Sequence, residues 1–212
     1  MPKTTFLNLP DDKKQRIFQS AVAEFGDFPF ETASISRIVR NSGISKGSFY
    51  QYFEDKKDLF RYVVSVVSDK KHYLMEKILE QKKNLPFFSM LRELFFEGCL
   101  FGKNNPELAA IADNLMKDPY LKEEFLNENL QRVHEFAVKL LKIGLDKGEV
   151  DDGIDLYFTA GMLISLNIGI AHCLSREAKY SDLELRSTVE KMMNFVENGI
   201  KIKKYKKNKE RK

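Results

Sequence analysis

Residues 32–60 read TASISRIVRNSGISKGSFYQYFEDKKDLF and form the most informative segment of the chain. Ile35, Ile38 and Val39 recur at helical spacing, which predicts a short helix with one buried face. Gly43 follows and suits the left-handed conformation in which helices commonly end. A second helix is expected to start directly after this tight turn, so the stretch predicts a helix-turn-helix.

The second helix is expected to begin after Ser45, a favoured capping residue, and to end near Tyr52. Phe49 and Phe53 lie four residues apart and are expected to point inward. The residues left for the outside or the rim are Lys46, Gly47, Ser48, Tyr50, Gln51 and Tyr52. A short helix that presents such side chains is typical of a surface that enters a groove of DNA.

Three residues in or near this helix disfavour helix formation, and such violations of local preference tend to mark functional sites. Gly47 costs about 1 kcal/mol relative to Ala inside a helix, which is tolerable where a bulky partner must approach the backbone. Lys46 and Lys56 each fall in the first turn of a helix, where a cation opposes the helix dipole by about 0.3–1 kcal/mol. Each lysine alone reads as ordinary solvated surface. The two together, beside two tyrosines, favour contact with phosphate, which binds at helix N-termini.

The segment 42–59, SGISKGSFYQYFEDKKDL, resembles the DNA-binding signature of TetR-type bacterial transcriptional regulators. The resemblance covers residues from about 12 to 62, and it departs from the family pattern only at Ser42, where Ala is usual, and Phe49, where Leu is usual. It implies contacts to base edges by Lys46, Gly47, Ser48 and Gln51. It implies contacts to backbone phosphates by Thr32, Ser34, Tyr50, Tyr52 and Lys56. Thr32 and Ser34 have the alternative of simply capping the first helix.

Composition narrows the class of protein. With 212 residues, 43% hydrophobic and 31% charged, the chain is expected to be globular with an ample core. Cys99 and Cys173 lack the spacing of a metal or redox motif, which fits a reducing cytoplasm. The three histidines form no close pair, and the N-terminus does not resemble a signal peptide. We therefore expect a cytoplasmic protein without a metal or cofactor.

The net charge of +4 is unevenly distributed. Residues 1–62 carry ten Lys and Arg against eight Asp and Glu, so DNA binding should depend on placed contacts more than on bulk charge. Residues 201–212 carry eight basic residues and one Glu. This tail is either a solvated helix end or an arm that attracts DNA without sequence preference.

The remaining chain predicts an all-α fold of about nine helices. Pro86, Pro106 and Pro119 each suit the start of a helix, and one long helix is expected from Asp58 to about Lys82. We expect a three-helix, helix-turn-helix DNA-binding domain over residues 1–62. A helical ligand-binding and dimerisation domain over 63–205 and a basic, disordered tail over 206–212 are expected to follow.

Residues 156–174 are 19 positions without a formal charge, close to the roughly 20 that cross a bilayer. Polar residues within the run favour burial in protein over membrane insertion. Gly161, Ser165 and Gly169 recur every four residues, and such a stripe of small side chains allows another helix to approach. We therefore expect a partner subunit on this face and no membrane.

The last helix is expected to start at a capping box formed by Ser181 and Glu184. An apolar stripe follows and, with the preceding helix, suggests a homodimer built on a four-helix interface. The predicted interface comprises Gly161, Ser165, Gly169, Leu185, Val189, Met192 and Val196. The alternative is that the stripe packs within its own chain.

The resemblance also implies a small-molecule pocket in the C-terminal domain, and the many Phe and Met residues suggest an apolar effector. The candidate residues are Phe95, Cys99, Met116, Phe125, His134, Tyr157, Phe158 and Met162. The predicted function is a repressor that binds a double-stranded, pseudo-palindromic operator as a dimer and that an effector releases. An enzyme is not expected, because no catalytic motif is present. The alternative is a helical ligand-binding or interaction protein that does not act through sequence-specific DNA binding.

Overall fold

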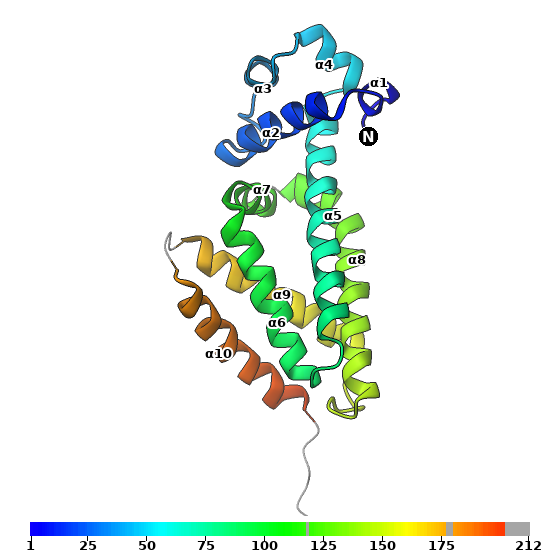
Figure 1. The fold of residues 1–212 in the computed structure, drawn as a ribbon, viewed down its shortest axis with the longest axis vertical. Coiled ribbons are helices and arrows are strands. Elements are labelled where there is room, and N and C mark those ends of the chain that lie inside the picture. The colour runs from blue at the N-terminus through cyan, green and yellow to red at the C-terminus, as the bar shows by residue number, and fades with distance from the viewer. Residues whose placement is uncertain (118, 177–179, 202–212) are drawn as a thin grey trace, which may run out of the picture. The chain divides into compact units, whose positions relative to one another are not determined.

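The computed structural model describes the backbone of residues 1–117, 119–176 and 180–201, and their side chains except at 116–120, 122–129 and 171–179. The described residues form ten α-helices (Figure 1). The helices are α1 (Thr4–Leu7), α2 (Asp11–Asp27), α3 (Ile35–Ser42), α4 (Lys46–Tyr52), α5 (Lys56–Lys82), α6 (Phe87–Asn104), α7 (Pro106–Lys117), α8 (Pro119–Asp146), α9 (Leu156–Arg176) and α10 (Asp182–Ile200). The β pairing in the described part is one isolated bridge between Val150 and Lys201. The predicted all-α fold is confirmed.

Local sequence signals set the helix ends. Pro106 and Pro119 are the first residues of α7 and α8, where a missing N–H costs nothing. At α10 the Ser181 hydroxyl accepts the N–H of Glu184, and the Glu184 carboxylate accepts the N–H of Ser181 at 2.8 Å. The predicted starts at Pro106 and Pro119 and the predicted capping box are therefore confirmed, whereas α6 begins at Phe87, one residue after the predicted start at Pro86.

The chain forms two compact units. The first contains residues 1–74 and 100–131, and the second contains residues 75–99 and the described residues from 132 onward. The sequence predicts a division after residue 62, with residues 100–131 in the C-terminal domain. The structure instead groups those residues with the first unit, because buried Ile111 and Leu115 complete its core. The predicted tail at 206–212 lies outside the described residues.

The core of the first unit joins α2 to the helices that follow it. The inward face of α2 consists of Ile17, Phe18, Ala21, Val22 and Phe25. Helix α2 also packs against α7 (Figure 1). The Asn114 amide of α7 donates to the carbonyl of Phe25 at 3.2 Å.

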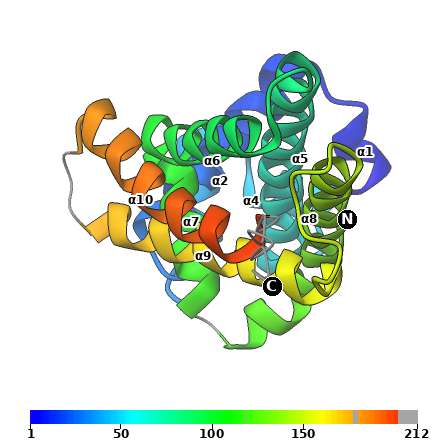
Figure 2. The same ribbon diagram turned by 90° about the horizontal axis from the view of Figure 1, so that it is seen from below.

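In the second unit, ion pairs join α10 to α6. Arg92 lies 3.0 Å from Glu190 and 2.7 Å from Glu197, and Arg186 lies 3.0 Å from Glu93. Figure 2 shows α10 running between α6 and α9. Over the described residues, no helix is both long enough and apolar enough to cross a bilayer.

Candidate nucleic-acid interface

The turn between α3 and α4 forms as the sequence predicts. Gly43 is left-handed, with φ 70° and ψ 30°, and the N–H of Ile44 donates to the carbonyl of Val39 at 3.0 Å. Ile38 and Phe49 are fully buried. Because they come from different helices, their burial fixes α3 and α4 to one core.

The start of α4 is capped and open to solvent. The Ser45 hydroxyl accepts the N–H of Ser48 at 3.0 Å. Lys46 is exposed as the first helical residue. A side chain at Gly47 would meet only the Ser45 hydroxyl, at 3.7 Å, so packing within this chain does not require a glycine there. The predicted approach of a partner to the backbone at Gly47 stays a prediction.

The exposed face of α4 carries four of the six side chains expected on its outside or rim. Lys46, Gly47 and Gln51 are exposed, and Tyr50 is 45% exposed, whereas Ser48 is half-buried. Tyr52 is only 6% exposed, and its ring lies 6.2 Å from that of Phe6. The prediction that Tyr52 faces outward was wrong, because the N-terminal segment covers it.

Thr32 and Ser34 stand before α3, but neither hydroxyl caps it. Thr32 is exposed, and its hydroxyl donates to the carbonyl of Pro29 at 3.2 Å. Ser34 occupies the N-cap position without a side-chain cap bond, and its N–H donates instead to the carboxylate of Glu24 at 2.6 Å. The expected hydroxyl caps are absent from this described segment because a residue of α2 performs that function.

Sequence reasoning missed Glu24, which is 4% exposed. Burial raises the pKa of this carboxyl, but hydrogen bonds from Arg37 and from the N–H of Ser34 outweigh burial and bring the pKa below its ordinary value. The carboxylate therefore stays ionised and fixes the start of α3. A glutamate inside the apolar face of α2, next to Phe25, was the available signal.

Lys56 is the residue whose environment differs most from expectation. Its Nζ donates to the carbonyls of Phe30 at 2.6 Å, Glu31 at 3.0 Å and Ala33 at 2.8 Å. An ammonium has three N–H donors, so these bonds use all of them. Burial lowers the pKa of Lys56 below its ordinary value. The predicted phosphate contact stays a prediction, but in this structure Lys56 fastens the loop before α3 to α5.

The eight predicted effector residues fall into four pairs. Phe95 and Cys99 are buried on α6, whereas Phe158 and Met162 of α9 are 67% and 46% exposed. His134 and Tyr157 line a pocket. The side chains of Met116 and Phe125 lie outside the described residues.

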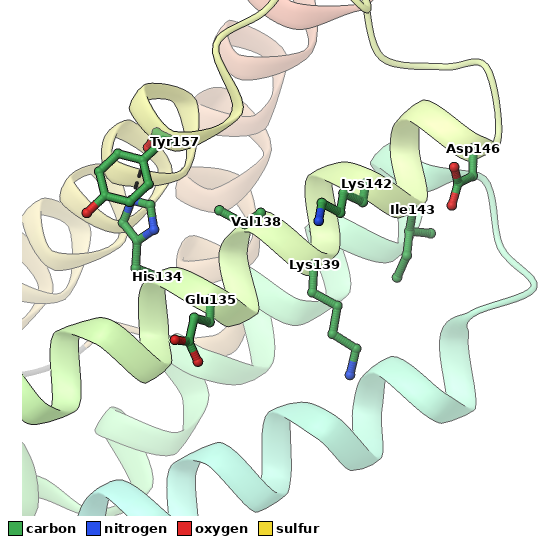
Figure 3. Close-up of a pocket in the computed structure, with 8 residues that line it drawn as sticks. All are labelled: His134, Glu135, Val138, Lys139, Lys142, Ile143, Asp146 and Tyr157. Atoms are coloured by element: carbon green, nitrogen blue, oxygen red, sulfur yellow. Dashed lines mark hydrogen bonds between the residues drawn. The ribbon is translucent and has the colours of Figure 1, made fainter.

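The pocket lies along α8 and the start of α9 and has a volume of about 620 Å³ (Figure 3). The rings of His134 and Tyr157 pack 3.9 Å apart, and a ring nitrogen of His134 lies 3.0 Å from the carbonyl oxygen of Tyr157. Lys139 also lines the pocket but is paired with Glu76 at 2.8 Å. The full lining is His134, Glu135, Val138, Lys139, Lys142, Ile143, Asp146 and Tyr157.

The predicted dimer interface is partly corrected. Ser165 and Gly169 are exposed on α9, and Gly161 is half-buried. On α10, Leu185 and Val189 are each 1% exposed, Val196 is 5% exposed and Met192 is half-buried. The prediction of a dimer contact is therefore wrong for Leu185, Val189 and Val196. This stripe of α10 packs within its own chain, as the alternative interpretation predicts. The exposed apolar side chains that sequence reasoning missed are Ile168, Leu183 and Phe195.

Comparisons with known proteins agree with this geometry. The family model described as "Bacterial regulatory proteins, tetR family" matches residues 17–63, which contain α3 and α4. The uncharacterized HTH-type transcriptional regulator YfiR of Bacillus subtilis is 25% identical over 170 residues, covering 76% of this chain and 78% of YfiR. The fatty acid metabolism regulator protein of the same species is 20% identical and covers 84% of this chain and 91% of the relative.

Solved structures share the fold over most of the chain. A TetR family transcriptional regulator from Chloroflexus aurantiacus superposes with a TM-score of 0.69 at 26% identity, covering 96% of this chain and 100% of that one. The regulator FadR from Bacillus subtilis, solved in complex with stearoyl-CoA, has a TM-score of 0.72 at 19% identity, covering 85% and 97%. The latter likeness is one of fold.

Proposed function

Because the chain belongs to the TetR family of transcriptional regulators, we propose that it binds a pseudo-palindromic DNA operator as a homodimer and releases it when an effector binds. Within this proposal the protein is a repressor, as the resemblance to the family implies. A cytoplasmic location is part of the same proposal. The relatives are regulators rather than enzymes.

The observation that carries the proposal is the exposed face of α4. Lys46, Tyr50 and Gln51 are exposed on one seven-residue helix whose buried side chains anchor it to the core. Of the described residues, none forms an ion pair or hydrogen bond with the Lys46 ammonium. A cation at a helix N-terminus is unfavourable alone but suits an anionic partner.

The exposed groups divide by chemistry. Lys46 and Gln51 are assigned to base edges, because Lys donates hydrogen bonds to guanine and Gln forms a bidentate pair of hydrogen bonds with adenine. Gly47 and Ser48 lie between them and allow close approach. Tyr50 is assigned to backbone phosphate, together with the hydroxyls of Thr32 and Ser34. Tyr52, being buried, supports this surface from below.

The proposed dimer face lies on α9 and α10. Phe158 and Met162 are exposed beside the small residues Ser165 and Gly169 of α9, and Phe195 of α10 is 72% exposed. Apolar surface of this kind favours association, because water is released when it is covered. A twofold axis there gives two copies of α4, which an operator of two half-sites requires.

The proposed effector is apolar or amphipathic. One relative is a fatty acid metabolism regulator, and one solved neighbour holds stearoyl-CoA. In the second unit, Phe95 and Cys99 of α6 are buried, and a side chain at Gly98 would lie 3.9 Å from Asn167 of α9 and 3.9 Å from Met75 of α5. An effector that enters between these helices would separate them and would favour one position of α5 over another. Because α4 directly precedes α5 in the chain, such a shift would change the position of α4.

The test is selection of bound sequences from random duplexes, followed by anisotropy titration at stated salt. Gln51→Ala should relax discrimination at one base pair by about 1–3 kcal/mol. Gln81→Ala is the control, because Gln81 is an exposed glutamine of α5 in the second unit. Failure of the wild-type protein to enrich any sequence would favour the alternative, a helical ligand-binding or interaction protein that does not read DNA.

A further inference from the structure

The C-terminal end of α4 has no local cap. The last four carbonyls of any helix lack partners within it, and many helices end in a left-handed glycine that satisfies some of them. Here the residue after α4 is Phe53, in the extended conformation with φ −130° and ψ 149°. No basic residue lies in the last turn of α4, all of which is described. Three carbonyls at this end, those of Tyr50, Gln51 and Tyr52, therefore depend on donors from elsewhere.

The N-terminal segment supplies these donors. The N–H of Lys3 donates to the carbonyl of Tyr52 at 2.9 Å, and the Nζ of Lys3 donates to the carbonyl of Tyr50 at 2.9 Å. The hydroxyl of Thr5 donates to the carbonyl of Gln51. The fourth carbonyl, that of Phe49, accepts the N–H of Phe53 at 2.9 Å. All four carbonyls thus have partners, and the Lys3 cation lies at the negative end of the helix dipole.

Phe6 anchors the segment. Its side chain is fully buried, and its ring lies 4.7 Å from that of Phe53 and 5.0 Å from that of Tyr62. Two of its partners, Phe53 and Tyr52, flank the end of α4. Since an isolated seven-residue helix is unstable in water, contacts of this kind decide whether α4 keeps its shape between encounters with DNA.

We propose that the N-terminal cap, defined as Lys3, Thr5 and Phe6, positions the recognition helix for base readout. The inference rests on the proposed function, in which α4 reads DNA. Thr5 donates to the carbonyl of Gln51 itself, so the cap holds the backbone of the residue assigned to adenine. These are positioning residues: they act through α4 rather than by touching DNA.

The first experiment uses the free protein and needs no operator. Thr5→Val removes the hydroxyl with little change in shape, and Thr4→Val is the matched control, since Thr4 is also exposed. Lys3→Pro removes both Lys3 donors and fits the backbone, because φ of Lys3 is −72°. Amide hydrogen exchange of residues 50–53 should be about 3- to 10-fold faster in Thr5→Val and faster still in Lys3→Pro. Unchanged exchange in both variants would overturn the cap.

The second experiment separates positioning from direct contact. Lys3→Met should weaken binding to the selected operator by about 2- to 10-fold, the effect of one hydrogen bond, with the salt dependence unchanged. Lys77→Met, at an exposed lysine of the second unit, controls for loss of charge. A salt slope that falls by about 0.9 per subunit would identify Lys3 as a phosphate ligand and overturn the positioning role. If the wild-type protein binds no operator, the proposed function fails. The hydrogen-exchange result still decides whether the N-terminal cap stabilises the end of α4.

Discussion

Arg37 and Glu24 form a two-pronged ion pair beneath the helix-turn-helix: the Nε of Arg37 lies 2.9 Å from each carboxylate oxygen of Glu24. Arg37 also donates to the carbonyl of Thr32 at 2.9 Å. The pair therefore joins α2, α3 and the loop between them. Its geometry, rather than any residue of the exposed face, fixes where α3 begins.

Glu24→Gln should lower the free energy of unfolding, because only one of the two terminal atoms of the glutamine amide can accept a hydrogen bond from Arg37. The expected loss is about 1.5–3 kcal/mol, the range for hydrogen bonds to charged groups. Urea unfolding monitored by circular dichroism measures the change. Glu54→Gln, at an exposed glutamate of the same unit, should change it by less than about 0.5 kcal/mol. Equal effects of the two variants would contradict a structural role for the pair.

The same pair predicts a pH dependence of stability. In the folded protein the pKa of Glu24 is below its ordinary value of 4.5, so the unfolded chain takes up this proton first as the pH falls. The contribution of Glu24 is complete above about pH 4.5, the ordinary pKa, and is lost as the pH drops through the folded pKa. Unfolding titrations at pH 3–6 should show a shallower acid dependence in Glu24→Gln than in the wild type. If the stability of the two proteins changed with pH in parallel, Glu24 would not be a source of the acid dependence.

Lys56→Met distinguishes a structural clamp from a phosphate ligand. Methionine keeps much of the stem but removes the three bonds to Phe30, Glu31 and Ala33. As a clamp, Lys56→Met should cost about 1–3 kcal/mol of stability and weaken DNA binding without changing the salt slope. As a phosphate ligand, it should reduce that slope by about 0.9 per subunit. DNA-binding titrations at four salt concentrations distinguish the clamp from the phosphate ligand, with Lys57→Met as a control for the loss of charge.

Short-range signals account for what the sequence predicted well. The spacing of Ile35, Ile38 and Val39, the glycine at 43 and the box at Ser181 each act within one or two turns. Their outcome depends little on the rest of the chain, so the helix-turn-helix and most helix ends could be read directly.

Long-range packing accounts for what the sequence did not predict. Lys56 finds its acceptors 23 to 26 residues away, and Lys3 reaches Tyr50 across 47 residues. No local pattern encodes such pairs. On α10 two apolar faces compete, one with Val189 and one with Phe195, and only packing shows that the first is buried and the second exposed.

Gly144 tests the packing of the second unit. A side chain added there would lie 3.0 Å from the ring of Phe87 and closer still to the side chain of Val150. Gly144→Ala should therefore lower the free energy of unfolding by about 1–3 kcal/mol through overpacking. Gly102→Ala is the control, because nothing lies within 4 Å of its added side chain and α6 should gain about 0.5–1 kcal/mol. Stabilisation by both changes would show that α8 can move away from Phe87.

The exposed apolar face of α9 and α10 predicts the oligomeric state. Phe195→Glu and Phe158→Glu each place a charge where the proposed twofold interface would bury an aromatic ring, so each should convert a dimer to a monomer by sedimentation velocity. Tyr73→Glu is the control, because Tyr73 on α5 is 71% exposed, as Phe195 is 72% exposed, and lies outside this face. A dimer that survives both changes would place the interface elsewhere. A monomeric wild type would remove the proposed basis for binding two half-sites, since one copy of α4 reads only one.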